Sequence, residues 1–281
     1  MYVVTGITGR VGGAAARRLL EAGLPVRGVV RDAAKGAAWT ERGCEIALAA
    51  MDDAEALTRA FAGAEGVFIV PPPVFDPKPG FPEARATVAA VRRALEAAKP
   101  SKVVWLSTVG AQAGQPNLLS QHTLMEAAIA DLALPLTILR PAWFMDNAMW
   151  DVPAARDEGV LRSFLAPLDG AIPMVASKDV GETAADLLRE TWTGKRIVEL
   201  EGPAAISPND LAAAFGRVLD RPVEAQIVPR ETWGGLFRDQ GMADPLPRIQ
   251  MLDGFNEGWL TFEGMPRAGA TDLDAVLRAL V

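Results

Sequence analysis

The sequence predicts an α/β protein with a doubly wound parallel sheet and a smaller C-terminal α/β lobe. Short β-branched segments alternate regularly with helix-forming segments from the N-terminus to about residue 150, which is typical of parallel strands joined by right-handed helical crossovers. Beyond that point the alternation changes, without any internal repeat or low-complexity linker. We therefore predict a larger part over residues 1–150 and a dependent lobe over residues 151–281, with the chain crossing between the two.

Composition and charge narrow the class of protein. Half of the 281 residues are hydrophobic, enough to bury a full core. The net charge of −7 and the single histidine argue against a nucleic-acid partner and a metal site. No apolar run reaches the roughly 18 residues that span a bilayer, and the N-terminus leads directly into a strand. We therefore predict a cytoplasmic protein without nucleic-acid, membrane or metal partners.

The first expected strand leads into a glycine-rich turn. Residues 3–5 are followed by glycines at positions 6, 9 and 12 and then by a helix former from Ala14 onward. Gly6 allows a tight turn, Gly9 a close approach to a pyrophosphate, and Gly12 packing of the helix on the strand. The N–H groups and the positive end of the helix face such an anion. This turn predicts a dinucleotide site with contacts at Gly6, Thr8, Gly9, Arg10, Val11 and Gly12.

The end of the second expected strand, residues 24–30, indicates which dinucleotide binds. Arg31 and Asp32 follow about 20 residues after the glycine turn, where such a fold meets the adenine ribose. An acidic residue there accepts the ribose hydroxyls, whereas Arg31 would pair with a 2′-phosphate through its planar guanidinium. We therefore predict NADP(H), with NAD(H) as the less favoured alternative. Arg10 and Lys35 could add charge to the same pocket.

The next elements place further candidates at the carboxyl edge of the sheet. Helices are expected over residues 33–42 and from residue 52, and strands over residues 45–48 and 66–70. The second of these strands is continuously apolar, as in a sheet covered on both faces, and prolines end it. The loop over residues 71–81 could lie along the cofactor or be a simple exposed connection. We predict cofactor contacts at Val70, Pro71 and Pro72.

A strand that ends in two hydroxyl groups provides the next candidates. It covers residues 102–106, after a long helix over residues 82–98, and continues into Ser107 and Thr108. Both are expected to contact the cofactor, and Ser107 also to act in catalysis. A helix over residues 120–130, with Ser120 as N-cap, precedes a strand over residues 134–139, after which Pro141 is a further cofactor contact.

Beyond residue 150, we expect a helix over residues 179–190 and strands over residues 196–200 and 223–228. We predict that Ser207 is the N-cap and Pro208 the first residue of another helix. A short final helix is expected to begin at Thr271. These elements cannot cover their apolar residues alone. We therefore expect a lobe over the carboxyl edge, with a substrate cleft between the lobe and the sheet.

Aromatic and methionine residues near this cleft could line a substrate pocket or form the core. Trp143, Phe144, Met145 and Met149 follow the strand that leads to Arg140. We assign two of these four to the core, and the same division to Trp233, Phe237, Phe255 and Trp259. Our candidates for the substrate pocket are Trp143, Phe144 and Asn147.

Together these motifs resemble the NmrA-like family of atypical short-chain dehydrogenases/reductases, and most closely its bacterial quinone-reductase and azoreductase-like branch. The resemblance implies a Rossmann-type domain, a small C-terminal domain and NADP(H) binding. Members are either reductases of quinones and other conjugated electrophiles or catalytically silent redox sensors. The similarity rests on residues 5–12, 30–31, 106–111, 122–126, 134–141 and 144–147, and continues to residues 179–181.

The catalytic residues of ordinary short-chain dehydrogenases are absent. Their Tyr-x-x-x-Lys pair has no counterpart, because the single tyrosine, Tyr2, lies in the first strand. The expected helix carries His122 instead. This chain resembles the benzylic-ether and isoflavone reductases, in which a lysine stands at the corresponding place and donates a proton. Glu126, on the same helical face, could orient His122 or raise its pKa. Alternatively, His122 is a partly buried structural residue or helps to hold the cofactor.

These observations predict an NADP(H)-dependent reductase that transfers a hydride to a quinone-like or other conjugated small molecule. His122 or water would supply the proton, and Ser107 and Thr108 would donate hydrogen bonds. The alternative is a catalytically silent NADP(H) sensor that acts through a protein partner, and a lyase or isomerase stays open as a third interpretation. We expect a monomer or a homodimer.

Overall fold

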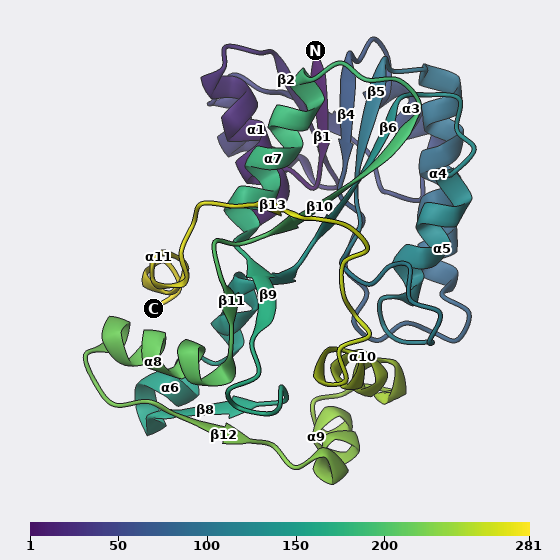
Figure 1. Cartoon of the computed structure of the whole chain (residues 1–281). Coiled ribbons are helices and arrows are strands. Elements are labelled where there is room, and N and C mark those ends of the chain that lie inside the picture. The colour runs from purple at the N-terminus through teal and green to yellow at the C-terminus, as the bar shows by residue number, and fades with distance from the viewer.

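The computed structural model describes residues 1–281 and contains an eight-stranded, entirely parallel sheet (Figure 1). The strand order is β13-β10-β6-β5-β4-β1-β2-β3. This confirms the predicted Rossmann-type sheet. Its strands are β1 (Tyr2–Thr5), β2 (Val26–Val30), β3 (Glu45–Leu48), β4 (Gly66–Ile69), β5 (Lys102–Leu106), β6 (Leu136–Pro141), β10 (Lys195–Glu201) and β13 (Arg267–Ala268).

Helices cover both faces of this sheet because its central strands are apolar on both sides. Val4 and Phe68 pack toward one layer of helices, and Val3 and Val67 pack toward the other. The first layer contains α1 (Arg10–Glu21), α2 (Ala33–Thr40) and α7 (Ser177–Arg189), and the second contains α3 (Ala54–Phe61), α4 (Pro82–Ala98) and α5 (Ser120–Ile129). None of the helices combines the length and apolar character that crossing a bilayer requires.

A smaller lobe lies beyond the carboxyl ends of the strands (Figure 1). It holds two small sheets, of order β11-β9-β7 and β12-β8, and its own apolar core around Phe215 and Leu277. Its elements are β7 (Trp143–Phe144), the 3-10 helix η1 (Met145–Trp150), α6 (Val152–Glu158), β8 (Val160–Ser163), β9 (Ile172–Val175), β11 (Ala205–Ile206), α8 (Pro208–Leu219), β12 (Glu224–Ile227), the 3-10 helix η2 (Arg230–Thr232), α9 (Trp233–Asp239), α10 (Leu246–Asn256) and α11 (Leu273–Arg278).

Residues beyond 150 belong to both parts of the molecule. Strands β10 and β13 join the large sheet, and α7 packs against α1. The division into a cofactor-binding part over residues 1–150 and a substrate-binding lobe over residues 151–281 therefore stays a prediction. Residues of the later segment contribute to the same large sheet.

Local capping signals were decisive at one predicted helix start and misleading at another. Ser207 caps α8 in a reciprocal capping box with Asp210, and Pro208 is the first helical residue, as predicted. The prediction that Ser120 caps α5 is wrong, because Leu119 occupies that position. The Asn117 side chain accepts the Leu119 N–H at 2.7 Å, while the Ser120 hydroxyl accepts the Asn117 N–H at 3.0 Å.

The C-terminal segment runs back across β10 and is held there by two buried carboxylates (Figure 1). Glu199 accepts the N–H groups of Glu263 at 2.9 Å and Gly264 at 2.8 Å. Asp179, on α7, accepts the Thr271 N–H at 2.8 Å and the Thr271 hydroxyl at 2.5 Å. The last 20 or so residues are thus tied to the large sheet by acceptors that lie far away in sequence.

We predict that Asp179→Ala lowers the free energy of unfolding by about 3 kcal/mol, because it leaves the N–H and hydroxyl of Thr271 without their buried acceptor. Urea unfolding measures this change, and Asp169→Ala, at an exposed carboxylate, is the matched control. Equal stability of the two variants would contradict the anchoring role of Asp179.

Candidate functional site

The turn between β1 and α1 has the geometry of an anion cradle. Gly6 adopts a φ of 61°, and the Gly9 N–H donates to its carbonyl at 2.9 Å. A Cβ on Gly12 would lie 2.3 Å from the Gly6 carbonyl oxygen, so any side chain there would force the helix away from the turn. No side chain caps α1 and no acidic residue occupies its first turn. The first N–H groups of α1 are therefore available to an anion such as a pyrophosphate.

The exposure of the predicted contacts agrees with this geometry. Gly6, Thr8, Gly9 and Arg10 are exposed, whereas Val11 and Gly12 are buried behind them. A pyrophosphate can therefore meet Val11 and Gly12 only through their backbone.

The end of β4 lies directly beside the glycine turn. A Cβ on Gly6 would contact the Val70 side chain at 3.2 Å. Thr5 joins the two strand ends, since its hydroxyl donates to the Phe68 carbonyl at 3.2 Å and accepts the Val70 N–H at 2.7 Å. Val70 and Pro72 are half-buried and Pro71 is buried. The structure thus brings the candidates of both loops to one place at the carboxyl edge.

Arg31 is exposed at the end of β2 and forms no ion pair or side-chain hydrogen bond, and Lys35 is likewise exposed and unpaired. The neighbouring Asp32 caps α2, where its carboxylate accepts the Ala34 N–H at 2.9 Å. The carboxylate that would favour a free ribose is therefore engaged locally, while the guanidinium that would bind a 2′-phosphate is free.

Arg10 points elsewhere than expected. Its guanidinium donates to the Asp146 carbonyl at 3.3 Å and lies 3.6 Å from the Asp146 carboxylate. Arg10 therefore connects the glycine turn to η1, which corrects the expectation that it adds charge beside Arg31. The attraction of Asp146 is the physical reason.

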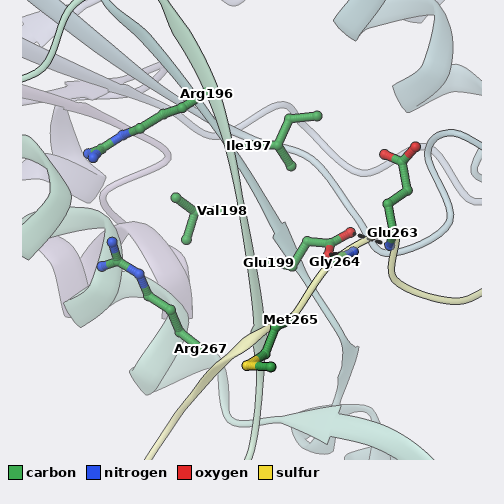
Figure 2. A pocket seen from close by; sticks show the side chains of 8 residues that line it. All are labelled: Arg196, Ile197, Val198, Glu199, Glu263, Gly264, Met265 and Arg267. Carbon is green, nitrogen blue, oxygen red and sulfur yellow. Dashed lines mark hydrogen bonds between the residues drawn. The ribbon is translucent and has the colours of Figure 1, made fainter.

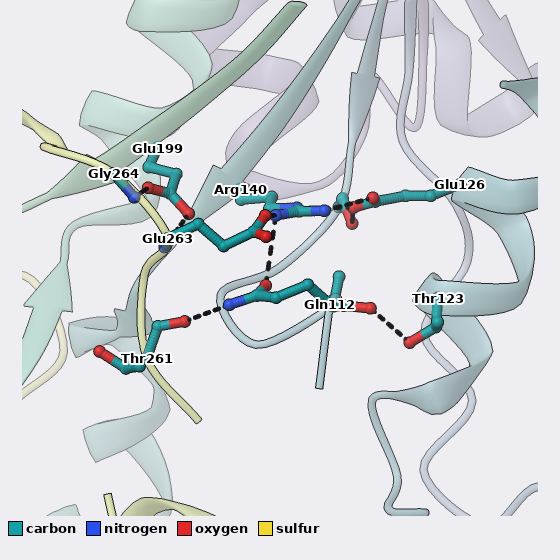
Figure 3. A network of polar contacts seen from close by, with 10 residues as sticks. Gln112, Thr123, Glu126, Arg140, Glu199, Thr261, Glu263 and Gly264 are labelled. Carbon is teal, nitrogen blue, oxygen red and sulfur yellow. Dashed lines mark hydrogen bonds and ion pairs between the residues drawn. The ribbon is translucent and has the colours of Figure 1, made fainter. Parts of the chain in front are cut away.

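A buried polar network occupies the middle of the carboxyl edge (Figure 3). Arg140, in β6, donates from Nε and Nη2 to the two Glu126 carboxylate oxygens at 2.9 and 2.7 Å. Its Nη1 donates to Gln112 at 3.2 Å and to Glu263. Burial lowers the pKa of Arg140, but the hydrogen bonds and charges of Glu126 and Glu263 outweigh it and raise that pKa above its usual value.

Ser107 belongs to this network and is not free to serve a substrate. Its buried hydroxyl donates to the Glu126 carboxylate at 2.5 Å. A hydroxyl has a single proton, so the expectation that Ser107 stabilises a substrate oxyanion conflicts with this contact. The half-buried Thr108 hydroxyl has no partner in the chain and stays available. Pro141, the last residue of β6, is buried beside Arg140 and exposes no donor.

His122 is not oriented by Glu126, contrary to expectation, because Arg140 and Ser107 engage that carboxylate. Burial lowers the pKa of His122 to about 4, although the charge of Glu126 acts in the opposite direction. The predicted rise in this pKa is therefore wrong. Nδ1 of His122 is buried without a hydrogen-bond partner. The imidazole is neutral near pH 7 and can act there as a hydrogen-bond donor or acceptor, with little capacity to donate a proton.

Three of the six aromatic candidates are buried in the core, and the other three are half-buried. Trp143 is half-buried and packs edge-on against Phe255, with ring centroids 5.0 Å apart, and Phe144 is also half-buried. Met145 is buried, while Asn147 and Met149 are exposed. In the second group three residues are buried instead of the two expected, because α9 and α10 pack on β7 and its neighbours: Trp233, Phe237 and Phe255, with Trp259 half-buried.

A hollow of about 650 Å³ lies at the outer edge of the sheet, around β10 and the C-terminal segment (Figure 2). β10 is separated from β1 by three other strands, and the hollow contains none of the predicted site residues. No group of three or more His, Cys, Asp or Glu side chains is arranged to hold a metal ion.

Comparison with known proteins identifies the family. A model described as the NmrA-like family matches residues 2–253. The chain belongs to the NmrA-like family. It is 28% identical to an NAD(P)H azoreductase from Xenophilus azovorans, over 90% of this chain and 87% of the relative. It is 32% identical to a (4-alkanoyl-5-oxo-2,5-dihydrofuran-3-yl)methyl phosphate reductase from Streptomyces griseus, over 79% and 75% of the two chains.

A solved structure of the same kind supports the whole-chain likeness. The NADPH-dependent quinone oxidoreductase QOR2 from Escherichia coli, in complex with NADPH, matches with a TM-score of 0.81 at 25% identity and covers 100% of both chains. The similarity to this structure therefore extends past residue 200, where the sequence motifs alone are sparse.

Several residues of the site carried no signal in the sequence. Gln112 and Glu263 reach Arg140 from segments about 30 and 120 residues away, as the network in Figure 3 shows. Asp76 accepts the N–H groups of Ala243 at 2.7 Å and Asp244 at 3.1 Å, and so connects the loop after β4 to the lobe. Only the tertiary fold brings these groups together.

We predict that Arg31→Ala weakens NADPH binding about tenfold to a hundredfold and leaves NADH binding unchanged, because only NADPH carries the phosphate that the guanidinium would pair with. Equilibrium titration of nicotinamide fluorescence measures both affinities. Arg59→Ala, at an exposed arginine in the last turn of α3, is the control. Equal losses for the two nucleotides would contradict the role of Arg31.

The lowered pKa of His122 predicts an acid-sensitive contribution to stability. In the unfolded chain, the His122 imidazole binds a proton below its ordinary pKa of about 6.5. In the folded protein, it binds a proton only near pH 4. The contribution is therefore complete above about pH 6.5 and is lost as the pH falls toward 4. When the pH falls from about 7 to about 4.5, the free energy of unfolding should decrease less in His122→Gln than in the unmodified protein. The difference should reach up to about 3 kcal/mol, as measured by urea unfolding. Identical losses would refute a buried neutral imidazole.

Proposed function

We propose that this chain reduces a quinone-like or other conjugated small molecule, with NADPH as the hydride donor. The observation that carries the proposal is the glycine cradle beside the free Arg31, in a chain whose NmrA-like relatives are named as azo, furanone and quinone reductases. The chain is accordingly an NAD(P)H-dependent oxidoreductase acting on a small molecule. The substrate, the site residues and their roles are the proposal.

The residues that would hold the cofactor follow from the geometry of the edge. The first N–H groups of α1, with Thr8 and Gly9, would bind the pyrophosphate, and Arg31 with Lys35 would bind the 2′-phosphate. Val70, Pro71 and Pro72 would border the cofactor beside the glycine turn. Bound NADPH supplies a hydride from C4 of its nicotinamide. The Thr108 hydroxyl at the end of β5 and Pro141 at the end of β6 would face the nicotinamide end.

The chain then needs to contribute little further chemistry. Reduction of a quinone consumes one hydride and one proton and forms a hydroquinone, and water can supply the proton once the developing oxyanion is held. We assign that task to the Thr108 hydroxyl, with neutral His122 as a second hydrogen-bond donor. Ser107 acts indirectly through Glu126, as a positioning residue. Tyr2 takes no part, since it is the first residue of β1, away from the carboxyl edge, and its hydroxyl donates to Glu65 at 2.5 Å.

The proposed acceptor lies against the face formed by Trp143 and Phe144, with Asn147 at its exposed rim. A flat ring system suits this surface, because the half-buried aromatic rings offer stacking and edge contacts. The cytoplasmic location and the monomeric or homodimeric state stay predictions.

A catalytically silent NADP(H) sensor is the alternative. The absence of a Tyr-x-x-x-Lys pair favours it, as does the low pKa of His122, which removes an obvious proton donor near neutral pH. The proposal and the alternative differ in turnover, because both require NADPH binding.

We predict NADPH oxidation with at least one member of a panel of quinones, azo compounds and enones, followed by the loss of nicotinamide absorbance. Thr108→Val should lower kcat about a hundredfold, because it removes a donor to the developing oxyanion. Thr58→Val, at a helix hydroxyl that bonds only the Ala54 carbonyl, is the matched control. Tight NADPH binding without turnover of any acceptor would replace the reductase with the sensor.

A further inference from the structure

Arg248 is a shielded arginine without a carboxylate partner. Four other arginines are half-buried or buried, and each pairs with a carboxylate: Arg27 with Glu45, Arg92 with Asp131, Arg140 with Glu126 and Arg196 with Glu190. Arg248 is half-buried and forms no ion pair. Its only side-chain hydrogen bond is a weak one, from Nη1 to the Met242 sulfur at 3.8 Å.

The surroundings of this guanidinium are apolar. It lies over the Phe237 ring, 4.2 Å from the centroid, and Phe237 is fully buried. Burial lowers the pKa of Arg248. Arg248 also lies in the first turn of α10, where the helix dipole disfavours a cation. The Asp244 carboxylate nearby accepts the Leu246 N–H at 3.1 Å and forms no pair with Arg248. A half-buried cation with so little compensation is unfavourable, and a bound anion would supply the missing charge.

Arg248 is also placed beside the proposed acceptor site. The Leu118 N–H, just before α5, donates to the Pro247 carbonyl at 2.8 Å. Asp76, in the loop after β4, holds the segment immediately before α10 through Ala243 and Asp244. Both loops leave the carboxyl edge of the sheet, and α10 lies below that edge in Figure 1. The apolar cluster around Phe237 includes Met242 and extends to Trp143, the proposed wall of the acceptor pocket.

We propose that Arg248 binds an anionic substituent of the substrate, a carboxylate, sulfonate or phosphate, and so selects anionic conjugated acceptors. This inference rests on the proposed reductase function. The planar guanidinium can donate two parallel hydrogen bonds to such an oxyanion. Phe237 supports the opposite face of the guanidinium and fixes its direction. The anion lies apart from the reduced group, so Arg248 sets specificity and takes no part in hydride transfer.

The test compares naphthoquinone with its sulfonate derivative in Arg248→Met, Arg248→Lys and the unmodified enzyme. We expect Arg248→Met to lower kcat/KM for the sulfonate about tenfold to a hundredfold through KM, and to leave the neutral quinone unchanged. Arg248→Lys should restore part of the loss because it keeps the charge. Arg238→Met, at an exposed arginine of α9, is the matched control. Removing an unpaired cation should not unfold the protein, which urea unfolding checks.

Two results would overturn the inference while leaving the reductase intact. One is an equal loss, or no loss, for the neutral and the sulfonated quinone. The other is a parallel loss of NADPH affinity, which would identify a cofactor phosphate as the anion. If the unmodified enzyme reduces neither quinone, the wider panel of acceptors tests the reductase proposal separately. Titration of the NADP⁺-loaded protein with naphthalene sulfonate then decides: weaker binding by Arg248→Met supports the anion site, and equal binding refutes it.

Discussion

The buried ion pair between Arg140 and Glu126 is the interaction on which the candidate site depends. It joins the end of β6 to α5, and through further hydrogen bonds it fixes Ser107, Gln112 and Glu263. Loss of Arg140 would leave the largely buried Glu126 without a counter-charge, and loss of Glu126 would leave the buried Arg140 with only the exposed Glu263. Either loss is more damaging than loss of a surface pair. The pair therefore holds β5, β6, α5 and the C-terminal segment in one arrangement at the carboxyl edge.

This constraint explains how the site divides its tasks. The glycine turn and Arg31 lie on one side of the edge and provide backbone donors and a free cation, as an anionic dinucleotide requires. The Arg140 network lies on the other side, and its polar groups form hydrogen bonds with one another. Ser107 is thereby withdrawn from direct chemistry, and Thr108 is left as the free hydroxyl at the end of β5. The result is a site rich in binding groups and poor in acid–base catalysts, which suits acceptors that need only a hydride and a held oxyanion.

Local signals made much of the fold predictable. The helix over residues 82–98 and the strand over residues 102–106 were predicted with their observed bounds, because proline and continuous apolar runs mark their limits. The glycine turn was predictable because its three glycines lie between a β-branched strand and a helix former. The prediction that Ser120 caps α5 failed because the Ser120 hydroxyl accepts the N–H of Asn117, which precedes the helix, and accepts no N–H within the helix. The pKa of His122, the partners of Glu126 and the isolation of Arg248 depend on burial and on contacts between separate helices, strands and loops, for which one sequence carries no local pattern.

Direct observation of hydride transfer tests the central claim most sharply. The measurement uses NADPH deuterated at either of the two C4 positions and a sulfonated triphenylmethane dye, whose central carbon retains the hydrogen it receives. A reductase of the proposed kind transfers deuterium to that carbon from one of the two labelled forms and not from the other, because the bound nicotinamide presents a single face. Tight binding of NADPH with no deuterium transfer from either form would contradict the claim.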